Sequence, residues 1–148
     1  MKVLESVMRY LFVILFAASL LSSCNDRSSF KPISFDGSIA EVDTKKLINN
    51  QPVFYSVIID DRRIDLFVVM VNGEVESYFN ACLTCYPKKL GFSFKDGRVI
   101  CRTCNESYPV DTLKDGIGNC YPIKLKGNMD NDRYIIKKED LMAGSKYF

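Results

Sequence analysis

The chain has 148 residues, of which 20 are basic and 18 acidic, so its formal net charge is only +2. This near balance gives no indication of a nucleic-acid partner. The chain contains no histidine, which excludes histidine-ligated zinc and copper sites, catalytic Ser-His and Cys-His pairs, and the two-histidine Rieske cluster. Its six cysteines therefore carry most of the information about function.

The first 24 residues have the pattern of an export signal. A weakly basic start is followed by the apolar run YLFVILFAASLL (10–21). This run is short for a membrane-spanning helix, which needs about 20 apolar residues, but it suits the core of a secretory signal. It ends in Leu21-Ser22-Ser23-Cys24, which resembles the cleavage box of bacterial lipoproteins. We predict lipid modification of Cys24; the alternative is a signal anchor with an ordinary thiol there.

This interpretation divides the chain into three parts. Residues 1–23 are the predicted signal peptide, 24–37 a lipidated N-terminus and polar tether, and 38–148 a single metal-binding domain. Cleavage removes Lys2, Glu5 and Arg9 and leaves a net charge of about +1. The predicted location is the cell envelope, with the domain exported from the cytoplasm and attached to a membrane by lipid.

The first half of the domain predicts β-strands. AEVDTKKLINN (40–50) fits either the start of a strand or a short helix. VFYSVII (53–59) and IDLFVVMV (64–71) are rich in β-branched and aromatic residues and flank the polar DDRR, which predicts a hairpin. Asn72-Gly73 predicts a tight turn, from which EVESYFNAC (74–82) leads into the first cysteine pair.

The second half continues in the same way. GFSFK and RVIC flank Asp96-Gly97, a preferred two-residue hairpin turn. That turn places Phe94 opposite Val99 and Phe92 opposite Cys101, which gives the hairpin one apolar face. RYIIKK (133–138) predicts a last strand and EDLMAG (139–144) a short helical turn.

Four cysteines form two Cys-x-x-Cys pairs, Cys82/Cys85 and Cys101/Cys104, separated by 15 residues. Each pair turns tightly enough to direct two sulfurs at one point, and a hairpin between the pairs brings them face to face. Four convergent thiolates suit zinc or an iron–sulfur cluster. The sequence therefore predicts a metal site at these four residues and leaves Cys120 as an extra thiol.

Disulfides or thiol redox chemistry are the alternative, because exported proteins commonly oxidise their cysteines. Once Cys24 carries lipid, five cysteines remain, and an odd number cannot all pair within the chain. Four ligands and one extra thiol is the simpler count. A thioredoxin-like function is disfavoured because neither pair opens an obvious helix.

From about residue 51 to its end, the chain resembles the FtrD-like family of membrane iron–sulfur proteins. The residues that carry the resemblance are Ala81-Cys82-Leu83-Thr84-Cys85-Tyr86, Gly91-Phe92, Cys101 and Cys104, Tyr108-Pro109, Gly118-Asn119-Cys120-Tyr121-Pro122, Asp140-Leu141 and Tyr147-Phe148. Many members have glycine where this chain has Asn105; both residues tolerate positive φ, so the second pair is expected to keep its turn.

The resemblance implies an iron–sulfur centre and an association with iron transport. The layout is also similar to a Rieske domain, so the expected fold is mainly β: a small Rieske-like sandwich with the metal on two loops joined by a hairpin. Structural zinc is the alternative cofactor. Residues 1–9 contain one arginine and no twin-arginine pair, so a chain that crosses the membrane unfolded would acquire its metal outside.

These observations predict an envelope lipoprotein that transfers electrons or assists metal transport, rather than an enzyme on its own. The expected partners are a membrane, through the lipid anchor, and a membrane metal-transport or electron-transfer complex. A zinc-containing interaction module and a thiol–disulfide redox protein are the alternatives. Lys88, Lys89, Arg98 and Arg102 flank the cysteines and are expected to stabilise a negatively charged centre.

Overall fold

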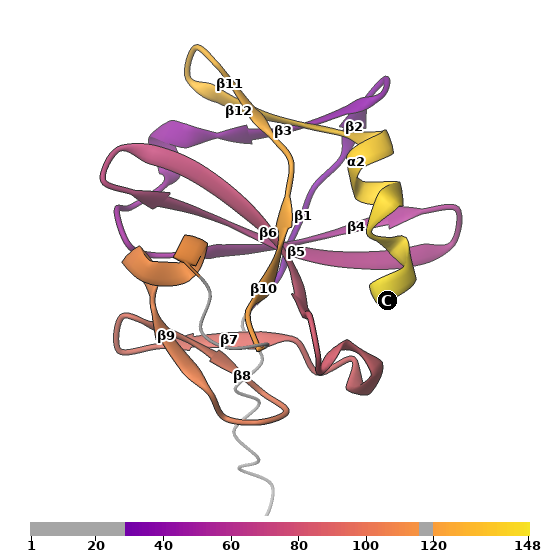
Figure 1. The fold of residues 1–148 in the computed structure, drawn as a ribbon. Coiled ribbons are helices and arrows are strands. Elements are labelled where there is room, and N and C mark those ends of the chain that lie inside the picture. Colours follow the sequence, from indigo (N-terminus) through magenta and orange to yellow (C-terminus); the bar gives the residue numbers. More distant parts are fainter. Residues whose placement is uncertain (1–28, 116–119) are drawn as a thin grey trace, which may run out of the picture.

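The central layer of the molecule is a five-stranded sheet, seen between two further sheets in Figure 1. The computed structural model describes residues 29–115 and 120–148. The strand order is β1-β4-β5-β6-β10, and every pair is antiparallel except β1 with β4. These strands are Lys31–Pro32 (β1), Val53–Ile59 (β4), Arg62–Val71 (β5), Glu74–Cys82 (β6) and Pro122–Leu125 (β10).

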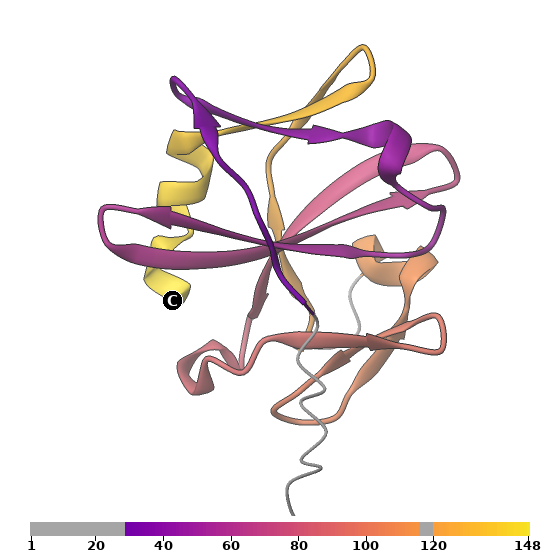
Figure 2. The ribbon, with the colours of Figure 1, turned by 180° about the vertical axis from the view of Figure 1, so that it is seen from behind.

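Two smaller antiparallel sheets cover its faces, as the reverse view shows (Figure 2). One has the order β11-β12-β3-β2, formed by Phe35–Asp36 (β2), Ile39–Asp43 (β3), Asn128–Asp130 (β11) and Arg133–Lys137 (β12). The other has the order β7-β8-β9, formed by Phe92–Lys95 (β7), Arg98–Cys101 (β8) and Ser107–Pro109 (β9). The prediction of a small, mainly β fold is confirmed; its likeness to a Rieske domain stays a prediction.

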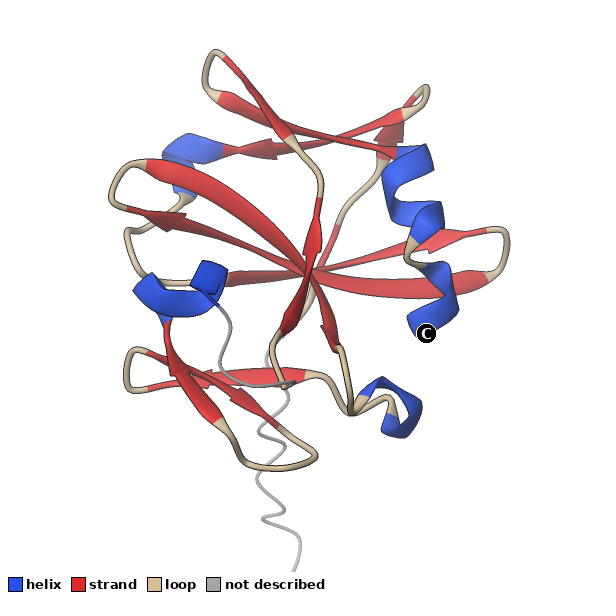
Figure 3. Ribbon diagram, viewed as in Figure 1, coloured by secondary structure: helices blue, strands red, loops and turns tan. Residues whose placement is uncertain are grey.

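The described helical segments are short and lie outside the sheets (Figure 3). They are the 3₁₀ turns Thr44–Lys46 (η1), Tyr86–Lys88 (η2), Val110–Asp115 (η3) and Ser145–Tyr147 (η4), and the α-helix Lys138–Ala143 (α2). The α-helix confirms the helical turn predicted after the last strand. The ambiguous segment 40–50 begins as strand β3 and continues into η1.

The central sheet is buried on both faces, which explains the continuous apolar runs in the sequence. Along β5, Ile64, Leu66 and Val68 pack in a first core with β3, β12 and α2. The alternate residues Phe67 and Val69 pack in a second core with the three-stranded sheet and η3. Because successive side chains of a strand point to opposite faces, one strand supplies both cores.

Three two-residue turns build the hairpins: two are the predicted Asn-Gly and Asp-Gly turns, and the third is shorter than the predicted DDRR connection because Arg62 and Arg63 already belong to β5. All four residues of the Asn72-Gly73 and Asp96-Gly97 turns have positive φ, between 51° and 83°. Asp60-Asp61 also has positive φ at both residues and joins β4 to β5. In the β7–β8 hairpin Phe94 pairs with Val99, and Phe92 pairs with Cys101, which confirms the predicted register.

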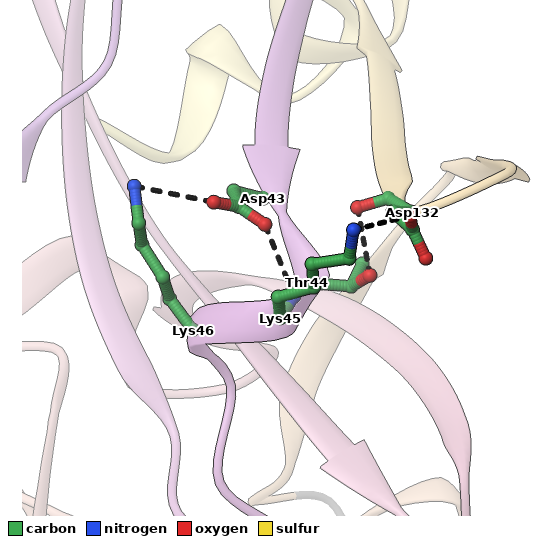
Figure 4. A network of polar contacts seen from close by, with 5 residues as sticks. All are labelled: Asp43, Thr44, Lys45, Lys46 and Asp132. Carbon is green, nitrogen blue, oxygen red and sulfur yellow. Dashed lines mark hydrogen bonds and ion pairs between the residues drawn. The ribbon is translucent and has the colours of Figure 1, made fainter.

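A polar network closes the end of β3 against the β11–β12 turn (Figure 4). The backbone N–H and hydroxyl of Thr44 both donate to the Asp132 carbonyl, at 3.0 and 2.8 Å. Asp43 accepts a hydrogen bond from the backbone N–H of Lys45 and so caps η1. Exposed ion pairs from Lys45 to Asp132 and from Lys46 to Asp43 add little stability, so the hydrogen bonds of Thr44 and Asp43 fix this corner.

The N-terminal part of the described chain joins the fold at residues 31–36, within the segment predicted to be a polar tether. Lys31 and Pro32 pair with β4, and Phe35 and Asp36 pair with β3. The predicted signal peptide and Cys24 lie outside the described residues. Within the described ranges, no helix is both long and apolar enough to cross a membrane.

Candidate metal centre

Five cysteine thiols gather at the edge of the second core. The sulfurs of Cys82, Cys85, Cys101 and Cys120 all lie within 4.8 Å of one another. The Cys120 sulfur is 3.2 Å from that of Cys82 and 2.9 Å from that of Cys104. All five are free thiols. The two Cys-x-x-Cys pairs therefore lie close together, but the mutual group of four contains Cys120 in place of the predicted ligand Cys104, which contacts Cys120 from outside that group.

The first pair lies where strand β6 ends. Cys82 alternates with Ala81, so its side chain enters the second core while Ala81 packs in the first. The backbone N–H of Cys85 donates to the Cys82 sulfur at 3.4 Å, which directs both sulfurs to one side of the turn. After this pair the chain continues through η2, whose C-terminal capping residue Lys89 has a φ of 54°.

The second pair follows strand β8. The backbone N–H of Cys101 donates to the Glu106 carbonyl, and that of Asn105 donates to the Cys101 carbonyl, at 2.8 and 2.9 Å. Asn105 has a φ of 62°, which confirms that asparagine takes the conformation expected there. Cys101 is fully buried, whereas Cys104 is exposed at the outer side of this turn.

A third segment, remote in sequence, brings Cys120 to the group. Strand β10 pairs antiparallel with β6, so that Pro122 lies opposite Cys82, and the backbone N–H of Leu83 donates to the Tyr121 carbonyl at 3.0 Å. This pairing sets Cys120 directly beside Cys82. In the sequence, Cys120 stands two residues before β10, but no local pattern indicates that this strand pairs with β6.

The two loops are tied together through Gly91 and Asn80. The Asn80 Oδ1 accepts a hydrogen bond from the backbone N–H of Phe92 at 2.7 Å, and the Gly91 carbonyl accepts one from Arg102 at 2.9 Å. Gly91 has a φ of 64°, and a Cβ atom there would lie 2.7 Å from the Asn80 carbonyl oxygen. Only glycine fits this position without displacing the hairpin.

Burial and mutual contacts shift the pKa values of three of these thiols, in different directions. Burial, followed by the hydrogen bond and charge of Cys82, raises the pKa of Cys85 to about 12. Burial and contacts with Cys104 and Cys82 also raise the pKa of Cys120. Burial alone would raise the pKa of Cys82, but hydrogen bonds from the Cys85 and Thr84 backbone and from the Cys120 thiol lower it. A cation is what would allow all of these sulfurs to be thiolates together.

Tyr108 places a buried hydroxyl beside the Cys120 sulfur. Its hydroxyl is buried and, among the described residues, has no hydrogen-bond partner of normal geometry. Burial raises the pKa of this hydroxyl, and the neighbouring Cys120 raises it further. An unpaired buried hydroxyl is destabilising, and donation to a metal-bound sulfur would satisfy it. The soft donor set and this hydroxyl both fit a zinc or iron–sulfur centre.

The flanking cations differ in their surroundings. Arg98 donates to the side chain and carbonyl of Ser107, at 3.0 and 2.8 Å, and so braces β8 against β9. Lys89 and Arg102 line a cavity of about 290 Å³, whose other walls include Tyr86 and Tyr147. The expected stabilising role of these charges toward the centre stays a prediction.

A family model described as "membrane iron-sulfur containing protein FtrD-like" matches residues 47–148, more than half of the chain. The chain belongs to the FtrD-like family. No curated protein matches it. The matched range contains all five described cysteines, so this FtrD-like protein carries its thiol group within the family region. The family and the four-cysteine group together fit a metal-binding protein.

Replacement of Gly91 by alanine tests how the loops are held. We expect Gly91→Ala to lower the free energy of unfolding by about 2 kcal/mol or more and to weaken metal retention, because a Cβ would collide with Asn80. Gly37→Ala is the matched control, since Gly37 has a similar φ of 62° and open space around it. Denaturant unfolding and metal analysis of both variants measure the difference; equal losses would show that the contact with Asn80 is unimportant.

Proposed function

We propose that this FtrD-like protein is an envelope lipoprotein with a four-cysteine iron–sulfur centre, acting in electron transfer or as an accessory of iron transport. The observation that carries the proposal is the group of four sulfurs within 4.8 Å of one another in a chain of this family. Thiolates are the usual protein ligands of such clusters. The centre would supply a one-electron redox couple.

Two ligand sets share Cys82, Cys85 and Cys101 and differ in the fourth residue. The sequence spacing favours Cys104, whereas the geometry supports Cys120, because its sulfur lies within the mutual group and Cys104 is exposed. We take Cys120 as the fourth ligand. The buried side chains of Phe92 and Val99 would then exclude water from the inner side of the centre.

Structural zinc is the second candidate. Four thiolates also form a closed tetrahedral zinc site, and the absence of a twin-arginine pair in residues 1–9 favours a metal acquired after export. Zinc would make the domain an interaction module without a redox couple. Optical absorption separates the two, because thiolate-to-iron charge transfer absorbs in the visible region and zinc does not.

Single substitutions of the cysteines test the centre and its ligands. We expect anaerobically purified protein to contain iron and sulfide and to absorb at roughly 330–460 nm. Cys82→Ser, Cys85→Ser, Cys101→Ser and Cys120→Ser should each lose most of the metal, because metal binding and folding of the loops are coupled. Cys104→Ser should retain it. Zinc without iron would support the second candidate, and full metal retention in Cys82→Ser would contradict both.

Tyr108→Phe tests whether its hydroxyl donates to the centre. Hydrogen bonds to cluster sulfurs raise the reduction potential, so we expect the variant to keep its metal and to have a lower potential. Tyr134→Phe is the matched control: its hydroxyl contacts Ser77 at 3.1 Å in the first core, and its loss should reduce stability by about 1 kcal/mol without moving the potential. An unchanged potential in Tyr108→Phe would exclude the hydrogen bond.

The lipid anchor would keep the centre next to a membrane partner. Leu21-Ser22-Ser23-Cys24 supports it, and more than one acyl chain gives stable anchoring. We expect Cys24→Ala to abolish both cleavage and lipid attachment, because that residue would carry the modification. Metabolic labelling with a palmitate analogue measures this, and labelling of the variant as strong as that of the native chain would argue against an anchor.

A further inference from the structure

The group contains five thiols, one more than a four-coordinate metal requires. We propose that Cys104 is a site of oxidation by hydroperoxides, with Cys120 as the resolving thiol, so that a Cys104–Cys120 disulfide removes a ligand and releases the metal. The inference rests on the proposed function, because it takes Cys120 as a metal ligand. It adds a reaction and a reactant to the site.

Exposure selects Cys104 as the first thiol to react. Thiol oxidation depends on solvent access and thiolate character. Cys104 is exposed, Cys85 and Cys120 are half-buried, and Cys82 and Cys101 expose only 2% and 0% of their surface. A metal would protect its four ligands further, since a coordinated thiolate is less available. Cys104 is then the thiol that solvent and peroxide reach.

Proximity selects Cys120 as its partner. The two sulfurs lie 2.9 Å apart, and a disulfide bond requires about 2.05 Å. Cys104 is carried on the turn fixed by the Asn105–Cys101 hydrogen bond, and Cys120 lies next to the β10–β6 pairing. The two cysteines therefore approach from separate backbone segments, so the bridge avoids the small ring of a Cys-x-x-Cys disulfide. Cys85 also contacts Cys104 and is the competing partner.

The chemistry balances with hydrogen peroxide as the oxidant. The Cys104 thiolate attacks one peroxide oxygen, the O–O bond breaks, and the departing hydroxide takes up a proton to give water and a sulfenic acid. The Cys120 thiolate then attacks the sulfenic sulfur, the S–OH bond breaks, and the departing hydroxide takes up a proton from solvent to give a second water. Two thiols lose two electrons to one peroxide molecule. A metal held by Cys82, Cys85, Cys101 and Cys120 would then keep three thiolate ligands, and a thiol reductant would restore the fourth.

Zinc-loaded full-length protein provides the sharpest test, because zinc itself does not react with peroxide. After addition of hydrogen peroxide, a chromogenic chelator follows zinc release, and peptide mass spectrometry maps the disulfide. We expect native protein to release zinc as the Cys104–Cys120 bridge forms. Cys104→Ser should retain zinc before peroxide is added and should then release it at least about tenfold more slowly than the native chain. Thr103→Ser, on the same turn, is the control and should behave as the native chain.

Every other result contradicts either this inference or the proposed function. Equal release from Cys104→Ser, or a disulfide between any other pair, overturns the inference. Loss of zinc from Cys104→Ser before peroxide is added also overturns it, because Cys104 would then be a ligand. A native chain that binds neither zinc nor iron contradicts the proposed function instead. In that case the reduced, metal-free chain still tests the pairing of the two cysteines. If no Cys104–Cys120 disulfide forms after peroxide is added, that pairing is refuted.

Discussion

The contact between Asn80 of β6 and the start of the β7–β8 hairpin is the constraint on which the thiol group depends. Asn80 is buried, accepts a hydrogen bond from Phe92, and lies so close to Gly91 that no side chain fits there. A buried amide oxygen without a partner would be costly, so this interaction fixes where the hairpin starts relative to β6. Because Cys82 ends β6 and Cys101 pairs with Phe92, the same contact sets the distance between the two cysteine pairs.

Burial of the central sheet on both faces gives this contact its rigidity. The first core holds β6 from one side through Phe79 and Ala81, and the second core holds it from the other through Tyr78 and Cys82. The end of β6 therefore cannot shift without disturbing both cores, which are close-packed. A centre at this position would have preorganised ligands on one side and solvent on the other, as both electron transfer and metal exchange require.

The thiol group is also electrostatically incomplete without a cation. Burial, and then contact with neighbouring sulfurs, raises the pKa values of Cys85 and Cys120, and the Tyr108 hydroxyl is buried beside them without a partner of normal geometry in the described part of the chain. One metal centre would resolve both problems, since it stabilises thiolates and makes the sulfurs better acceptors. The exposed fifth thiol at Cys104 then becomes the part of the group that responds to the environment.

The sequence by itself determined what local physics controls. Asn72-Gly73 and Asp96-Gly97 specify two-residue turns because their φ values must be positive, and the second turn sets the pairing of Phe92 with Cys101. The spacing of the two Cys-x-x-Cys pairs likewise specified that they could meet. The tertiary structure decided the rest. Only the pairing of β10 with β6, across about 40 residues, brings Cys120 into the group and leaves Cys104 at its edge, and such pairing depends on how the sheets pack as layers rather than on any short sequence pattern.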